Sequence, residues 1–209
     1  MSDSIDKLIH DAATWGYGYQ RIPLPGGREI PGHDRSGIIS AAFDTFDAKG
    51  KTVLDIGCYI GALTFEAARR GAKATGIDVS HGRIECANKI EAVLQTGAHF
   101  EVGRWPEYAK GKGRWDCILA INVLHHFKFV GHMLSVLLAS RERVFLELPE
   151  FKSGKWTLLN IGDVPFHRRA HQSALHRTAL IPVLSSLGRK VICGRSQDCK
   201  GPRWWYDCR

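Results

Sequence analysis

The sequence predicts an α/β fold built on a doubly wound, mostly parallel seven-stranded sheet that ends in an antiparallel hairpin. From residue 52 onward, short apolar segments rich in β-branched residues alternate with helix-length segments, a pattern typical of a parallel sheet with helices on both faces. The last two strand-like segments are separated only by residues 194–203, too few for a crossover helix, so they must pair antiparallel. With 209 residues, 44% of them hydrophobic, the chain fits one compact domain with a sizeable core.

The N-terminal part of the chain precedes this alternation. Residues 1–14 have the polar and apolar spacing of a short amphipathic helix. Residues 15–32 contain too many prolines and glycines to form regular structure. Residues 35–47 place apolar side chains at helical spacing, which predicts a second helix.

The strands and helices of the sheet are expected from apolar runs and from the glycines that end them. Apolar, β-branched runs of strand length predict seven strands at residues 52–56, 74–78, 98–102, 115–121, 143–148, 190–193 and 204–208. The longer segments between them predict helices at residues 61–70, 81–96, 131–140 and 174–187. Gly71 and Gly97 end the first two of these helices.

Charge and cysteine content limit the classes of protein. The net charge of +8 is compatible with an anionic partner such as RNA or with an ordinary solvated surface. The basic residues gather at residues 168–169, 189–190 and 200–203 without a long run. Apolar runs such as residues 117–123 are far shorter than the roughly 20 residues of a membrane span, and residues 1–10 lack an export signal, so we expect no membrane partner. The six cysteines show no zinc-like spacing, which predicts no metal site and reduced thiols in the cytoplasm.

The sharpest motif is Val53-Leu54-Asp55-Ile56-Gly57-Cys58-Tyr59-Ile60-Gly61, a strand that runs into a glycine-rich turn and then a helix. Ligands of doubly wound sheets bind at the carboxyl ends of the strands. Gly57 lets the backbone approach a ligand, and Gly61 allows the turn into the helix. Asp55 can hold a cationic amino group. Asp78, at the end of the next strand, can accept both ribose hydroxyls of a nucleoside.

These residues resemble the class I S-adenosylmethionine-dependent methyltransferases. Residues 53–61 look like the first motif of that family, Gly76-Ile77-Asp78 like the second, and residues 115–127 (WDCILAINVLHHF) like the fourth. The resemblance implies a Rossmann-like methyltransferase fold over residues 49–209, preceded by N-terminal helices and an aromatic lid segment in residues 1–48. It implies S-adenosyl-L-methionine as the cofactor, bound by Asp55, Gly57, Cys58, Tyr59, Gly61, Asp78, Val79, Trp105 and Asn122.

Two positions depart from the pattern of the family. Tyr59 stands where the family usually has glycine, so it must either tolerate the turn or pack over the cofactor. Gly103-Arg104-Trp105 replaces the usual acidic or amide residue near the adenine; Trp105 could offer the adenine a flat face or could be an ordinary core or surface tryptophan. A nicotinamide dinucleotide site is the rival interpretation, but its fingerprint is GxGxxG, and an acid ahead of the first glycine suits an ammonium ligand better than a pyrophosphate.

Candidate groups for the transfer step follow the fourth and fifth strands. The sulfonium donor already carries an electrophilic methyl group, so the protein must align the acceptor and exclude water. A general base could assist with oxygen or nitrogen acceptors. We expect that role for His126, which is preferred over His125, with His171 as the second candidate. Each histidine could instead be structural.

The segment around Trp15, Tyr17 and Tyr19 carries aromatic residues at alternate positions, followed by Pro-Gly-Gly and Pro-Gly pairs. If it is extended, its rings share one face, which suits either a strand packed on the core or a lid over the substrate. The pattern resembles the branch that contains the wobble-uridine tRNA methyltransferases of the methoxy and carboxymethoxy type. We expect methyl transfer to a hydroxyl or amine of a small molecule; an RNA methyltransferase of the same fold, or an inactive cofactor-binding regulatory module, are the alternatives.

Overall fold

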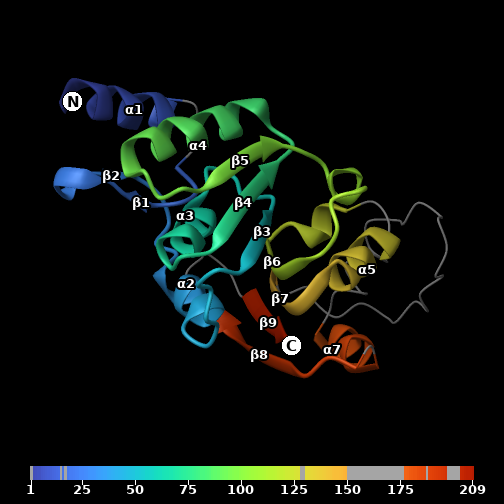
Figure 1. Cartoon of the computed structure of the whole chain (residues 1–209). Helices are drawn as coiled ribbons and strands as arrows, with labels where there is room; N and C mark the ends of the chain where they lie inside the picture. The colour runs from blue at the N-terminus through green and yellow to red at the C-terminus, as the bar shows by residue number, and fades with distance from the viewer. Residues whose placement is uncertain are drawn as a thin grey trace. The chain divides into compact units, whose positions relative to one another are not determined.

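Seven strands form one sheet in the order β5-β4-β3-β6-β7-β9-β8 (Figure 1), which confirms the predicted fold class. The computed structural model describes residues 2–14, 16, 18–127, 130–149, 177–186, 188–196 and 203–209. Contacts within the chain group into two compact units, Met1–Arg104 and Trp105–Arg209. The division at residue 48 stays a prediction.

The first unit is a βαβαβ arrangement with the N-terminal segment packed against it. It contains α1 (Ser2–Thr14), β1 (Ile22–Pro23), β2 (Glu29–Ile30), α2 (Ser36–Phe43), β3 (Thr52–Ile56), α3 (Ala62–Arg69), β4 (Lys73–Asp78), α4 (His81–Leu94) and β5 (His99–Val102). Strand β4 pairs in parallel with β3 on one side and with β5 on the other. Helix α1 lies along α4 (Figure 1). The predicted strands at residues 52–56, 74–78 and 98–102 are confirmed within one residue.

One expectation for this unit is wrong in part. Residues 15–32 are not wholly irregular, because β1 and β2 pair antiparallel with Ile22 opposite Ile30. The chain reverses through a short 3-10 turn at Pro25–Gly27, where Gly26 and Gly27 have φ values of 74° and 71°. Glycine adopts this left-handed conformation without a steric penalty, so the breakers permit the hairpin. Both isoleucines are buried, which fixes the hairpin on the rest of the unit.

The second unit carries the other four strands. It contains β6 (Trp115–Ile121), α5 (Val130–Leu138), β7 (Ser140–Pro149), α7 (Arg177–Ser186), β8 (Val191–Ser196) and β9 (Arg203–Cys208). Strands β8 and β9 form the predicted antiparallel hairpin, and β9 also pairs antiparallel with β7. The expected helix at residues 131–140 ends earlier, because Ser140 already pairs with Trp115 as the first residue of β7.

The core of the second unit is apolar on β6 and contains one buried ion pair. Residues 117–120 of β6 are fully buried. Arg143 on β7 and Asp207 on β9 expose 2% and 4% of their side chains and form a salt bridge between paired strands. Among the described helices, none has both the length and the apolar character that crossing a membrane requires.

Candidate functional site

The glycine-rich turn connects β3 to α3. Gly57, Tyr59 and Gly61 have φ values of 72°, 59° and 97°. The N–H groups of Gly57 and Cys58 donate to the carbonyl of Ile77 over 2.8 and 3.0 Å, so the turn is hydrogen-bonded to the C-terminal end of β4. The turn therefore has a fixed backbone shape before any ligand is considered.

Gly61 is required by close packing as well as by its backbone conformation. A Cβ atom at Gly61 would lie 2.6 Å from two ring carbons of Phe100 on β5. Real Cβ contacts are not that short, so a larger residue would displace either the phenyl ring or the start of α3. The sequence assignment of Gly61 to the entry of the helix agrees with this geometry.

Two carboxylates are buried at the ends of the paired strands β3 and β4. Asp55 exposes 3% and Asp78 exposes 5% of its surface. Asp78 accepts hydrogen bonds from the N–H of Tyr59 at 3.2 Å and of Ser80 at 2.9 Å. It also forms an ion pair with Arg83 at 3.5 Å. These contacts hold the Asp78 carboxylate beside the glycine-rich turn.

Asp55 has a different electrostatic environment. Its carboxylate accepts a hydrogen bond of 2.7 Å from the hydroxyl of Thr64 on α3. Burial raises the pKa of Asp55 to about 7; the negative charge of Asp78 adds to this rise, while the Thr64 hydroxyl and the positive charge of Arg35 oppose it. Asp55 therefore exchanges between its charged and neutral forms near neutral pH. A cationic ligand would shift this equilibrium toward the charged form.

Cys58 and Val79 complete the immediate surroundings of the two acids. The Cys58 side chain is buried, and burial raises the pKa of its thiol well above the usual range, so it stays protonated. Val79, directly after Asp78, is 52% exposed, and Val102, paired with Asp78 across β4 and β5, is 40% exposed. Two exposed apolar side chains beside a buried carboxylate make a surface suited to a flat, weakly polar base next to a ribose.

Tyr59 tolerates the turn and also reaches the N-terminal segment. Its hydroxyl donates to the carbonyl of Gly16 over 3.2 Å, and its ring meets the ring of Tyr19 edge to face at 5.5 Å between centroids. The guanidinium of Arg83 lies over the same ring, 4.6 Å from its centroid. A tyrosine in place of the usual glycine thus connects the turn to residues 16–19.

A second connection runs through Gln20, which is buried. Its side-chain oxygen accepts the N–H of Ala62, the first residue of α3, at 3.2 Å. A helix N-terminus leaves its first N–H groups without helical partners, so Gln20 caps α3 from the N-terminal segment. A Cβ atom at Gly32 would lie 2.4 Å from the backbone of Gln20, which shows how closely residues 20 and 32 approach.

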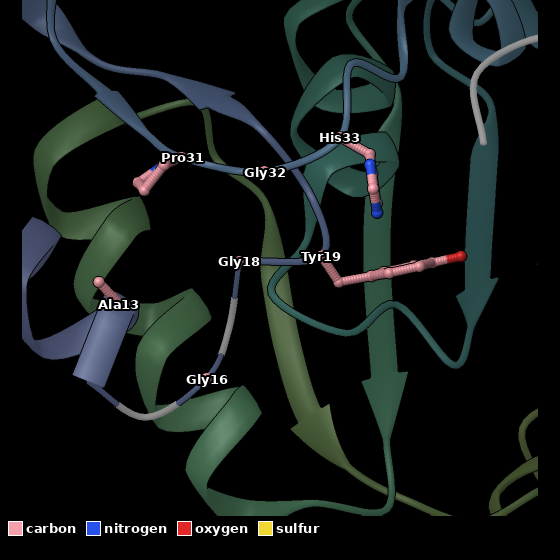
Figure 2. A pocket seen from close by; sticks show the side chains of 7 residues that line it. All are labelled: Ala13, Gly16, Gly18, Tyr19, Pro31, Gly32 and His33. Carbon is pink, nitrogen blue, oxygen red and sulfur yellow. The ribbon is translucent and has the colours of Figure 1, made fainter. Parts of the chain in front are cut away.

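A hollow of about 550 Å³ lies in this N-terminal segment (Figure 2). Ala13 at the end of α1 lies on one side and Pro31 on the other, and the rings of Tyr19 and His33 meet edge to face at 5.8 Å. The remaining lining residues are Gly16, Gly18 and Gly32. No lining side chain carries a permanent charge, and Tyr19 joins the hollow to Tyr59 of the turn.

The second unit holds the candidates near the end of β6. Asn122 has a φ of 53°, its N–H donates to the carbonyl of Glu147 over 2.8 Å, and its side-chain amide donates to the carboxylate of the same residue. Glu147 is fully buried on β7. His125 and His126 follow in a short 3-10 turn at Leu124–His126, with their rings 4.0 Å apart. His126 is exposed and His125 half-buried.

Trp105 is held by polar contacts inside the second unit. Its indole N–H donates to the carbonyl of His132 at 3.0 Å and to the hydroxyl of Ser135 at 2.8 Å. Only 4% of its surface is exposed, so little of the ring is accessible within that unit.

His171, Trp15, Tyr17 and the basic pair at residues 168–169 lie outside the described residues. In the described part of the chain, no group of three His, Cys, Asp or Glu side chains is arranged to hold a metal.

Sequence reasoning missed five residues of these surroundings: Thr64, Gln20, Arg35, Arg83 and Glu147. Arg83 could have been found, because it lies in the first turn of α4, the helix that follows the strand-end acid Asp78. Thr64 also follows its acid closely, but a threonine inside a helix ordinarily bonds its own backbone. Gln20 and Glu147 reach their partners only through tertiary folding, and no local sequence pattern predicts these contacts.

Comparison with known proteins gives the family. The profile of a family described as "Methyltransferase domain" matches residues 32–193. A ubiquinone biosynthesis O-methyltransferase of Azorhizobium caulinodans is 35% identical over 86 residues, which cover 41% of this chain and 34% of that protein. The chain thus spans about a third of the length of the curated relatives it matches.

Solved structures agree on the fold. The N-terminal domain of EvdMO1, determined in the presence of SAH and D-fucose, has a TM-score of 0.68 at 16% identity over 97% of this chain and 94% of that chain. Magnesium protoporphyrin IX methyltransferase of Synechocystis PCC 6803, with bound SAM, has a TM-score of 0.60 at 18% identity over 83% of this chain and 76% of that chain.

Proposed function

Since the chain belongs to the methyltransferase domain family, we propose that it transfers a methyl group from S-adenosyl-L-methionine to a hydroxyl or amine of a small molecule. The observation that carries the proposal is the pair of buried carboxylates, Asp55 and Asp78, on either side of a glycine-rich turn. The turn lies at the carboxyl ends of paired parallel strands, where nucleotide ligands of such sheets bind.

The residues fit the two ends of the donor. Asp55 would bind the ammonium of the methionine part, and Gly57 and Cys58 would present backbone to it. Asp78 would accept the ribose hydroxyls by charge-assisted hydrogen bonds. Val79, exposed beside it, would contact the adenine, with Trp105 as the further candidate that the sequence offered. Asn122 would line the methyl-donor side. The sulfonium supplies the electrophilic methyl group when the donor is bound.

The hollow beside Tyr59 supports a small acceptor. It is a shallow, open hollow, and its lining carries no permanent charge, which favours a neutral acceptor. The aromatic segment within the N-terminal residues 1–48 would then form a lid, tied to the cofactor turn through Tyr59 and to the start of α3 through Gln20. Small molecules also appear in the names of relatives, which include a ubiquinone biosynthesis enzyme and a structure with D-fucose. His126, or His171, would remove the acceptor proton.

An RNA acceptor is the second candidate, favoured by the net charge of +8. Its most specific version is methylation of a tRNA wobble uridine to a methoxy or carboxymethoxy product. A cofactor-binding regulatory module without turnover is the third.

The five cysteines that the structure describes are free thiols, four of them buried, which supports a reducing compartment such as the cytoplasm.

The test is methyl transfer from labelled S-adenosylmethionine to fractionated cell extract. We expect label in the small-metabolite fraction, with a rate that changes little between 50 and 300 mM salt. Label in RNA, with a rate that falls steeply as salt rises because phosphate contacts are screened, would support the RNA acceptor instead. Cofactor binding without label in any fraction would support the regulatory module and contradict transfer.

A further inference from the structure

Thr64 makes an unusual hydrogen bond for a helical threonine. It lies in the first turn of α3, it is fully buried, and its hydroxyl donates to Asp55 over 2.7 Å. A threonine inside a helix commonly donates to a backbone carbonyl one turn earlier. Here α3 instead places the hydroxyl on the carboxylate at the end of the preceding strand, so the helix orients the side chain that the cofactor would meet.

Gly76 makes room for this contact. A Cβ atom at Gly76 on β4 would lie 2.7 Å from the Thr64 hydroxyl oxygen and 2.9 Å from the Cys58 sulfur. Any other residue at Gly76 would push the hydroxyl or the turn away. The second motif of the sequence, Gly76-Ile77-Asp78, therefore has two roles. Its glycine leaves room for the hydrogen bond of Thr64 to Asp55, and its acid would bind the ribose.

Two charged groups and one neutral thiol act on or lie near Asp55. Asp78 on β4 repels its charge, Arg35 before α2 attracts it, and the buried Cys58 thiol is neutral. Arg35 exposes only 2% of its surface, so little water screens its attraction. A buried carboxylate with an acidic neighbour would take up a proton unless a donor and a positive charge opposed it.

We propose that Thr64 is a positioning residue, which holds the Asp55 carboxylate charged and oriented so that it recognises the ammonium of the methyl donor. The inference rests on the proposed function, because it takes S-adenosylmethionine as the ligand. The Thr64 hydroxyl acts through Asp55 and sets the pH range over which the amino-acid part of the donor adds to binding.

The consequence is a pH-dependent affinity with a defined sign. The ammonium binds to charged Asp55, and burial raises the pKa of Asp55 to about 7. Affinity should therefore be nearly constant above this pH and fall below it, by about tenfold for each further pH unit. Loss of the Thr64 hydroxyl removes a group that lowers the pKa, so the fall should begin at a higher pH.

Calorimetric titrations with two probes between pH 6 and 8.5 test this. S-adenosylhomocysteine carries the ammonium, and 5′-methylthioadenosine has the same nucleoside without the amino-acid part. We expect Thr64→Val to weaken S-adenosylhomocysteine about tenfold at pH 7 and much less at pH 8.5, with methylthioadenosine unaffected. Thr64→Ser should behave like wild type. Because variants are compared at the same pH, titration of the probes cancels.

A further variant keeps the test decisive. Should Thr64→Val not fold, Asp55→Asn must abolish the pH dependence for S-adenosylhomocysteine only. Equal weakening of both probes at every pH would overturn the inference and leave a structural role. Failure of wild type to bind either probe would instead contradict the proposed function.

Discussion

The backbone N–H of Tyr59 donates to the carboxylate of Asp78 over 3.2 Å, across the gap between the glycine-rich turn and the end of β4. The same tyrosine bonds Gly16 through its hydroxyl. One residue therefore links the proposed ribose acceptor to the N-terminal segment that carries the hollow. Because Tyr59 sits at a φ of 59°, where non-glycine residues are uncommon, its ring must contribute contacts that a glycine would not.

Replacement of Asp78 should affect the cofactor most. Asp78→Ala removes a charged acceptor whose hydrogen bonds are each worth about 1.5–3 kcal/mol, so the dissociation constant for S-adenosylhomocysteine should rise at least tenfold. Asp116→Asn, which removes a partly exposed carboxylate of the second unit, is the matched control and should change nothing. Unchanged affinity in Asp78→Ala would show that the ribose contact is assigned to the wrong acid.

Tyr59→Phe separates the two roles of the tyrosine. The variant loses the hydrogen bond to Gly16 but keeps the ring under Arg83. We expect faster amide hydrogen exchange in residues 18–22 and 30–33, with cofactor affinity within about twofold of wild type, because an exposed neutral hydrogen bond contributes only about 1 kcal/mol. Tyr108→Phe in the second unit is the control. Unaltered exchange would mean that the hydroxyl does not hold the segment.

The sheet could be predicted from sequence because its strands are local signals. The run Thr52–Ile56 is β-branched and apolar, and it is followed at once by a glycine turn, so its type and end are both readable. The pairing of β9 between β7 and β8 could not be read, because it depends on which strand edge is open once the others have paired. The short hairpin of Ile22 with Ile30 was hidden by the prolines and glycines that make its turn.

The candidate site divides in the same way. Asp55, Gly57, Gly61 and Asp78 stand out because each follows a strand or begins a helix at a fixed spacing. Val79 is exposed beside Asp78 as a ligand contact would require, and its role remains a proposal. The partners that tune the acids come from other elements: Arg35 from the approach to α2 and Thr64 from α3. Their contacts arise when those elements pack, and a local pattern does not encode them.

The buried Asp55 carboxylate should make the unliganded protein less stable at higher pH. Burial raises the pKa of Asp55 in the folded state to about 7, above its ordinary value of 3.8, so the folded state binds the proton more tightly than the unfolded state. The stabilisation is complete below about pH 4 and is lost as the pH rises through 7. Thermal unfolding at pH 5.5 and 8 should show a larger drop in wild type than in Asp55→Asn. Equal drops would show that Asp55 is charged throughout.

His126 is testable against its neighbour. If His126 accepts the acceptor proton, His126→Ala should lower kcat toward the roughly 10²-fold loss typical of a missing general base, with little change in cofactor affinity. The ring of His125 lies 4.0 Å from that of His126, and His125→Ala should lower kcat much less. The comparison is made on the methyl acceptor that labelling identifies. Undiminished turnover in His126→Ala would move the role to His171 or leave alignment alone to account for the rate.

The ion pair of Arg143 with Asp207 should matter for stability. Removal of one partner of a buried pair typically costs about 3–5 kcal/mol when the other charge is left uncompensated. Asp207 keeps a second partner in Arg209 at 2.8 Å, so the loss should lie below that range. Arg143→Met should therefore lower the denaturation midpoint, and the double variant with Asp207→Leu should recover part of the loss. Arg141→Met, on the exposed pair with Asp116, should be close to neutral. A mild effect of Arg143→Met would mean that Arg209, which lies 2.8 Å from the other oxygen of Asp207, compensates the carboxylate by itself.

The central claim is that the turn between Asp55 and Asp78 binds a sulfonium nucleoside, and a thermal-shift measurement on the whole chain tests it most directly. S-adenosylmethionine or S-adenosylhomocysteine at about a hundred times its dissociation constant should stabilise the protein by roughly 2.7 kcal/mol, and a carboxylated donor is compared in the same series. NAD and NADP should leave the midpoint where it is. A midpoint raised by the dinucleotides and indifferent to both sulfur nucleosides would contradict the account.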